Sequence, residues 1–90
     1  MNINMIIHSK AINRHGILLL KIDDLIDIVS ICKSEGIRIS AIDAFNIEND
    51  KIQPLMEDSL DFSGKILNWI IVDDYLNRMK SQKYLFEIVV

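Results

Sequence analysis

The sequence predicts an α+β fold, a single domain in which helices pack on one face of a small sheet. Three observations support this. The chain has 90 residues, the length of one domain. Half of its residues are apolar and 18 are isoleucine, which is enough for one modest hydrophobic core. Segments with helical spacing of apolar residues alternate with short segments of strand character.

Two short apolar segments precede the first clear helix. Asn2–Lys10 contains an Ile/Met run of strand character, and a polar turn through Asn13–Gly16 follows it. Ile17–Lys21 is too short for its periodicity to distinguish a strand from a helix. We therefore expect a strand within Asn2–Lys10 and assign no element to the second segment.

Ile22–Glu35 is predicted to be an amphipathic helix. Its apolar residues recur at spacings of three and four and form one stripe. Three aspartates lie near its start, where negative charge complements the helix dipole. Gly36 follows at the position where a helix end favours a left-handed residue.

Ile37–Ile47 is predicted to be a strand. Its odd-numbered positions form an apolar face that only Asp43 interrupts. Burial of an unpaired carboxylate is costly, so this residue needs an explanation. Either a β-bulge near Ala41–Ile42 turns Asp43 outward, or its side chain has a functional role. Glu48–Lys51 is predicted to be a turn.

The segments after this turn are harder to assign. We expect Glu57–Gly64 to form a structured loop. Ile66–Val72 fits either a strand or a helix, and we favour a helix that continues through Arg78 with Ser63 as its N-cap. The alternative is a strand followed by a shorter helix that Asp73 caps.

The chain closes with a predicted strand, Tyr84–Val90, which is rich in aromatic and β-branched residues. The larger aromatic side chains of the second half are expected in the core rather than at an interface. They are Trp69, Tyr75, Tyr84 and Phe86.

Charge is distributed unevenly along the chain. The net charge is −3, but residues 1–22 carry +3, residues 23–63 carry −7 and residues 64–90 carry +1. Between Asp43 and Asp61 there are six acidic residues and one basic residue, Lys51. This acidic segment is either a solvated surface or a patch that recognises a basic partner.

Known catalytic and metal-binding patterns are not found in the sequence. Asp43, Glu57, Asp58 and Asp61 do not have the spacing of a calcium loop or of a carboxylate metal site. We interpret His8 and His15 as surface residues, and Cys32 as a small buried hydrophobe. We therefore expect a protein without a metal, without a cofactor and without enzymatic activity.

Composition also constrains the compartment and the partners. A pI near 5.2 argues against a dedicated nucleic-acid binder. The single cysteine fits a reducing compartment. No apolar run approaches the length of a membrane span, and the first residues lack the features of a signal peptide. We expect a small cytoplasmic protein.

The middle of the chain resembles a known family. The residues GIRISAIDAFNI are followed by a polar turn, then KIQP, then EDSLDFS, and the chain has an aromatic-rich last strand, YLFEIVV. This order is similar to that of small bacterial immunity proteins of polymorphic toxin systems, including contact-dependent growth inhibition. The similarity covers Gly36–Ser63 and, more loosely, Tyr84–Val90.

The resemblance implies a non-catalytic cytoplasmic protein, a single immunity-protein-like domain over residues 1–90, that binds and blocks one cognate toxin, commonly a nuclease. Members of the family bind different toxins through different surfaces, so the motif assigns no contact residue. Together with the charge pattern, it suggests an acidic surface that occupies a basic groove of the toxin. The expected toxin-binding residues are Asp43, Glu48, Asp50, Glu57, Asp58 and Asp61.

Two alternatives from other classes remain. In the first alternative, the chain is a small regulatory or ligand-binding domain that forms a homodimer, with Tyr84–Val90 as an exposed edge strand that pairs across a two-fold axis. Alternatively, its carboxylates and a divalent metal form an enzyme active site, in which case divalent ions would raise its thermal stability.

Overall fold

The chain forms a layer of helices packed against a β-sheet, the α+β architecture that the sequence predicts. The computed structural model describes residues 2–90. Its elements, in chain order, are α1 (Ile3–Lys10), β1 (Ile12–Arg14), β2 (Ile17–Leu19), α2 (Ile22–Glu35), β3 (Ala41–Glu48), β4 (Lys51–Asp61), α3 (Trp69–Met79) and β5 (Leu85–Val89).

The main sheet has three antiparallel strands in the order β4-β3-β5, and β1 and β2 form a separate antiparallel hairpin. Leu20, directly after β2, joins the two. Its N–H donates to the carbonyl of Phe86 at 2.7 Å, and the N–H of Phe86 donates back at 2.9 Å. The hairpin therefore attaches to the outer edge of β5, and β5 lies between β3 and the end of β2.

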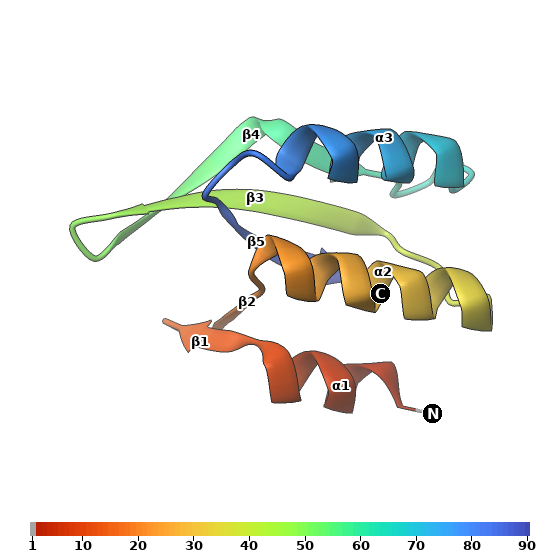
Figure 1. Ribbon diagram of the computed structural model, residues 1–90, viewed down its shortest axis with the longest axis horizontal. Helices are drawn as coiled ribbons and strands as arrows, with labels where there is room; N and C mark the ends of the chain where they lie inside the picture. The colour runs from red at the N-terminus through yellow and green to blue at the C-terminus, as the bar shows by residue number, and fades with distance from the viewer. Residues whose placement is uncertain (1) are drawn as a thin grey trace.

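The three helices of residues 2–90 lie side by side in the order α1, α2, α3, with neighbours antiparallel (Figure 1). Their apolar faces and one face of the sheet enclose the main hydrophobic core. At its centre the rings of Tyr75 and Phe86 pack edge to face, with centroids 6.3 Å apart and planes at 83°. Both side chains are fully buried, which confirms their predicted core positions.

Helix α2 has the predicted bounds, Ile22–Glu35. Gly36 ends it in a left-handed conformation, with φ of 67°, and the N–H of Gly36 bonds to the carbonyl of Cys32. Cys32 is fully buried on the apolar stripe, as expected, and burial raises the pKa of its thiol.

The predicted strand at Asn2–Lys10 is wrong, because residues 3–10 form helix α1. Asn2 caps this helix, since its side-chain oxygen accepts hydrogen bonds from the N–H groups of Asn4 and Met5. Ile3 and Ile7, four residues apart, are the pair that the helix buries. The adjacent run of Met5, Ile6 and Ile7 obscured that spacing in the sequence.

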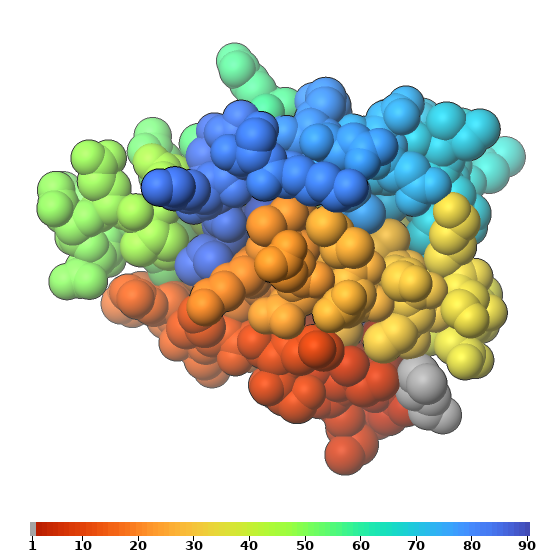
Figure 2. Space-filling model, in the orientation of Figure 1, coloured from red at the N-terminus to blue at the C-terminus, as the bar shows by residue number. Residues whose placement is uncertain are grey.

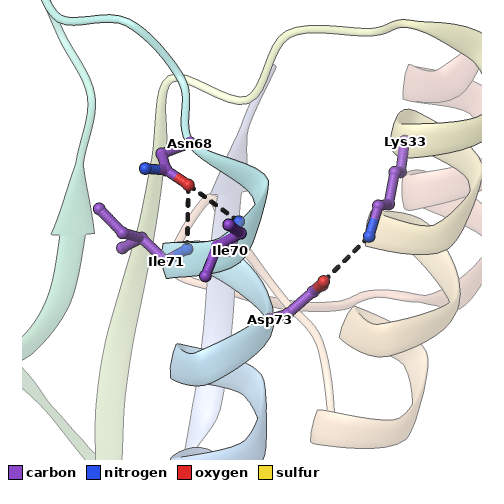
Figure 3. A network of polar contacts seen from close by, with 5 residues as sticks. All are labelled: Lys33, Asn68, Ile70, Ile71 and Asp73. Carbon is purple, nitrogen blue, oxygen red and sulfur yellow. Dashed lines mark hydrogen bonds and ion pairs between the residues drawn. The ribbon is translucent and has the colours of Figure 1, made fainter.

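Helix α3 begins at Trp69, so the ambiguous segment is helical only from that residue onward. Its N-cap is Asn68, whose Oδ1 accepts from the N–H groups of Ile70 at 2.9 Å and Ile71 at 3.4 Å (Figure 3). Neither predicted cap is correct. Ser63 lies five residues too early, and Asp73 lies inside the helix.

Strand β3 begins at Ala41, later than predicted, and its faces are the reverse of the expected ones. Ile42 and Ala44 are fully buried against the helices, whereas Asp43 is half-buried and lies on the opposite side of the sheet. The odd-numbered apolar pattern misled because Ile39 is buried before the strand starts and the alternation then changes phase.

No helix formed by residues 2–90 is long and apolar enough to cross a membrane.

Candidate functional site

Strands β3 and β4 are interrupted by a large bulge. Ile42 pairs with Leu60 and Ala44 pairs with Leu55, so the four residues Met56–Ser59 of β4 lie opposite Asp43 alone. Extra residues of this kind bend a strand and redirect its side chains. One of the two explanations for Asp43 was a β-bulge close to it. The structure does place a bulge next to Asp43, but the additional residues belong to β4. The loop predicted for Glu57–Gly64 is wrong up to Asp61, because these residues continue the strand.

Part-buried hydrogen bonds hold the bulge in place. The hydroxyl of Ser59 accepts from the N–H of Ala44 at 3.1 Å and donates to the carbonyl of Leu55 at 2.9 Å. The hydroxyl of Tyr75, from α3, donates to the carbonyl of Asp58 at 2.6 Å. Side chains thereby replace the ladder hydrogen bonds that the bulge removes, and the backbone of the bulge is fixed to the core.

The bulge presents Met56 and Glu57 to solvent, and the side chain of Met56 is 82% exposed. Asp58 is half-buried beside them. A fixed backbone that carries an exposed apolar side chain next to two carboxylates is suited to contact another macromolecule.

Further carboxylates lie on the face of the sheet that no helix covers, here called the helix-free face. Asp43 pairs across the strands with Glu87, and Asp61 pairs with Ala41, two residues from Asp43. Partial burial raises the pKa values of Asp43 and Glu87; the charge of Asp61 raises that of Asp43 further, and the charge of Asp43 raises that of Glu87 further. We refer to these residues together with the bulge carboxylates as the bulge surface: Asp43, Glu57, Asp58, Asp61 and Glu87.

Asp61 differs electrostatically from its neighbours. Hydrogen bonds from Ser63, including its backbone N–H at 2.8 Å, lower the pKa of Asp61, and the charge of Lys65 adds a smaller effect in the same direction. Asp61 therefore keeps its negative charge when Asp43 begins to take up a proton.

The remaining two predicted toxin-binding residues lie elsewhere. Glu48 and Asp50 are at the tip of the β3–β4 hairpin, which extends beyond the helix layer (Figure 1). Asn49 and Asp50 both have positive φ, 51° and 63°, as a two-residue type I′ turn requires. Five residues of extended chain, about 17 Å, separate Glu48 from Asp43. Asp50, 98% exposed, lies 3.7 Å from the guanidinium of Arg14.

The bulge surface also contains a carboxylate from outside the acidic segment of residues 43–61. Glu87 is the one charged residue of β5. Its position next to Asp43 depends on the pairing of β5 with β3, which strand patterns do not specify. The signal available in the sequence was its place within an otherwise apolar strand.

The five carboxylates of the bulge surface form no ion pair with a basic residue among residues 2–90, whereas four of the other eight acidic residues do. Lys10 lies 3.8 Å from Asp24 and 3.9 Å from Asp27, and Lys33 lies 2.9 Å from Asp73. Two basic residues near the start of the chain thus pair with acidic residues outside the bulge surface: Lys10 with α2, and Arg14 with the hairpin tip. Within residues 2–90 the bulge surface has no ion-pair partner, and the one basic charge that acts on it is that of Lys65 on Asp61.

The described residues offer no evident metal centre. Within residues 2–90, no three His, Cys, Asp or Glu side chains come together in a way that would hold a metal ion. His8 lies exposed on α1, and His15 lies exposed in the β1–β2 turn, in keeping with the predicted surface positions.

The bulge surface is therefore a rigid acidic patch with an apolar residue at its edge, suited to binding a basic partner. Comparison with known proteins found no protein-family model, curated protein or solved structure that matches the chain.

Proposed function

We propose that the chain is a cytoplasmic immunity protein that binds a basic protein toxin, such as a nuclease domain, and blocks it with the bulge surface. The observation that carries this proposal is the concentration of five carboxylates without ion-pair partners among residues 2–90, on a part of the sheet that part-buried hydrogen bonds hold in place. A groove that binds phosphates is lined by Lys and Arg, and a fixed array of carboxylates complements it.

The fixed backbone matters because inhibition requires tight binding. An interface that is already ordered loses less conformational entropy on association than a flexible loop does. Tyr75 and Ser59 order the bulge before any partner arrives. The proposed role needs no catalytic group, only shape and charge.

A homodimer formed through β5 has less support. The outer edge of β5 is engaged at Phe86 by both hydrogen bonds of Leu20, so only part of that edge is free to pair with another strand. Size-exclusion chromatography with light scattering distinguishes the two proposals, because the immunity proposal predicts a monomer that forms a one-to-one complex with its toxin.

The direct test is co-expression of the tagged chain with the polypeptide encoded immediately upstream of it. The proposal predicts that the two proteins purify together and that the chain abolishes the toxicity of the upstream polypeptide. Normal growth of cells that express the upstream polypeptide alone, or toxicity that persists in the presence of the chain, would reject the proposal.

Charge reversal then locates the interface. The double variant Glu57→Lys/Asp58→Lys should slow association at low salt by about tenfold or more and flatten its salt dependence. The matched control is Glu35→Lys/Asp74→Lys, which changes net charge equally at exposed helix positions. Equal slowing by both double variants would show that net charge, and not the bulge surface, steers binding.

A further inference from the structure

A second surface of opposite charge lies where the end of α2 meets the segment before α3. It is a groove of about 390 Å³, open to solvent. In Figure 2 the yellow residues that follow α2 lie beside the cyan residues that begin α3, at the end of the molecule away from the β3–β4 hairpin. Four apolar and two basic side chains contribute to its lining: Ile37, Ile66, Leu67, Trp69, Arg38 and Lys65.

An exposed aliphatic side chain lies at the groove: Ile66, one of its lining residues, is 92% exposed. Ile70, in the first turn of α3, is 73% exposed. Large aliphatic side chains exposed to this extent are typical of a surface that another molecule covers. Trp69, expected in the core, packs against it but is only half-buried, and its exposed part adds an aromatic surface of the kind that anchors interfaces.

Arg38 is held in position at the groove. Its Nη2 donates to the carbonyls of Phe62 at 2.6 Å and Lys65 at 2.9 Å. Neither acceptor carries a full negative charge, and no carboxylate of residues 2–90 lies within ion-pair distance of this guanidinium. The other N–H groups of the planar guanidinium are suited to bind a carboxylate, and the entropy of ordering the side chain has already been lost.

Polar contacts order the elements on either side of the groove. Asn68 caps α3, and Asp73, further along this helix, reaches across to Lys33 of α2 at 2.9 Å (Figure 3). The ion pair links the first turns of α3 to the last turn of α2. Lys65 supplies the second positive charge at the rim.

From these features we infer that the groove is a binding site for a peptide segment of a partner protein that presents an aliphatic side chain flanked by carboxylates. The apolar lining would receive the aliphatic side chain, and Arg38 and Lys65 would pair with the carboxylates. The volume is at the lower end for ligand sites and fits one or two side chains rather than a long acyl chain. This inference does not rest on the proposed toxin, whose basic surface would prefer the bulge surface.

The test is a titration of the ¹⁵N-labelled full chain, followed by NMR, with two acetylated and amidated tetrapeptides. The sequence of the first is Glu-Leu-Ile-Glu, and that of the second is Lys-Leu-Ile-Lys. Saturable shifts at Gly36 and at the Trp69 indole N–H are expected with the acidic peptide and not with the basic one. Equal binding of both peptides, no saturable shift with either, or binding of octanoate without binding of the acidic peptide would overturn the inference.

Variants separate the two kinds of contact. Lys65→Glu should weaken binding of the acidic peptide about fivefold, the scale of one exposed ion pair. Ile66→Ser should weaken it by a similar factor through lost apolar contact, and its exposure keeps the fold intact. The matched control is Met56→Ser, at an apolar residue of the bulge that is 82% exposed, which should leave binding unchanged. A loss of affinity in the control as large as that in Ile66→Ser would contradict the site.

Discussion

The two faces of the sheet use neighbouring residues in opposite ways. On the face toward the helices, Ala44 pairs with Phe86 and both are fully buried. On the helix-free face, Asp43 pairs with Glu87, and two like charges lie side by side. Each pair occupies the same two strands, one residue apart. The first pair stabilises the fold, whereas the repulsion within the second pair lowers its stability. Such unfavourable charge pairs are typical of residues that serve binding rather than stability.

The helix-free face is itself divided. Leu19 and Phe45 are buried although they do not belong to the main core, so this face has an apolar part as well as a charged part. The charged part coincides with the bulge, where β4 departs from regular pairing. Irregular backbone and unfavourable charge thus occur together on the helix-free face. Substitutions on the two faces should therefore change the free energy of unfolding by very different amounts.

The largest effect should come from the helix-covered face. Phe86→Ala removes a fully buried ring that packs against Tyr75 and should lower the free energy of unfolding by about 3–5 kcal/mol. Urea denaturation followed by circular dichroism measures it. The matched substitution one residue away, Glu87→Gln, should not destabilise the protein, and a comparable loss there would remove the distinction between the faces.

The link between the faces should have an intermediate effect. Tyr75→Phe removes the hydroxyl that donates to the carbonyl of Asp58 and should cost about 1–3 kcal/mol, since that carbonyl loses its partner. Hydrogen exchange should accelerate at the amide of Ala44, which the same bulge protects. If the variant weakened the protein without any change at Ala44, the tyrosine would support the core alone and not the bulge.

The like-charge pair should have a smaller effect of opposite sign. Asp43→Asn removes the repulsion of Glu87 and Asp61 by Asp43 and should raise the free energy of unfolding at neutral pH by up to about 1 kcal/mol. Thermal unfolding at pH 7 is the measurement. A lower melting temperature than that of the wild type would indicate that the charged carboxylate makes a stabilising contact.

The same pair predicts a dependence on pH. The pKa values of Asp43 and Glu87 are raised above their ordinary values of 3.8 and 4.5, so both groups bind protons more tightly in the folded state. Their contribution to stability should therefore grow as the pH falls through the folded pKa values, and it should level off below the ordinary ones. Asp61, with a lowered pKa, acts in the opposite direction at still lower pH. The double variant Asp43→Asn/Glu87→Gln should lack the rise.

The smallest effect on stability is expected at Glu57. Its side chain is exposed on the bulge and has no hydrogen bond or ion pair within residues 2–90. Glu57→Gln should change the free energy of unfolding by no more than about 0.5 kcal/mol. A larger change, measured by urea denaturation, would mean that the bulge surface contributes to the fold after all.

Local signals in the sequence predicted the parts of the fold that depend on local interactions. The apolar stripe and Gly36 gave α2 its correct bounds, and the β-branched last segment became β5. Helix α1 was missed because eight residues contain only two buried positions, Ile3 and Ile7, and an adjacent apolar run hides them. Capping by Asn68 was missed because other polar residues nearby are equally good caps in isolation.

The candidate site was predictable only in part because it depends on contacts between distant residues. The acidic segment identified Asp43, Glu57, Asp58 and Asp61, which the bulge brings together. It also included Glu48 and Asp50, which lie at the other end of the hairpin. Glu87 joins the site through pairing over more than forty residues, and no local pattern encodes such a pairing.

The position of β5 has a consequence for synthesis of the chain. This strand pairs with β3 on one edge and with Leu20 on the other, and the second pairing joins residues 20 and 86. On a ribosome, β2 and β3 are made long before residues 85–89, and until then their edges lack the strand that lies between them. The helices and the β3–β4 hairpin involve mostly local contacts and form early, whereas closure of the sheet awaits a long-range pairing. A nascent chain that stalls before residue 85 therefore exposes two unpaired strand edges, the state in which aggregation competes most strongly with folding.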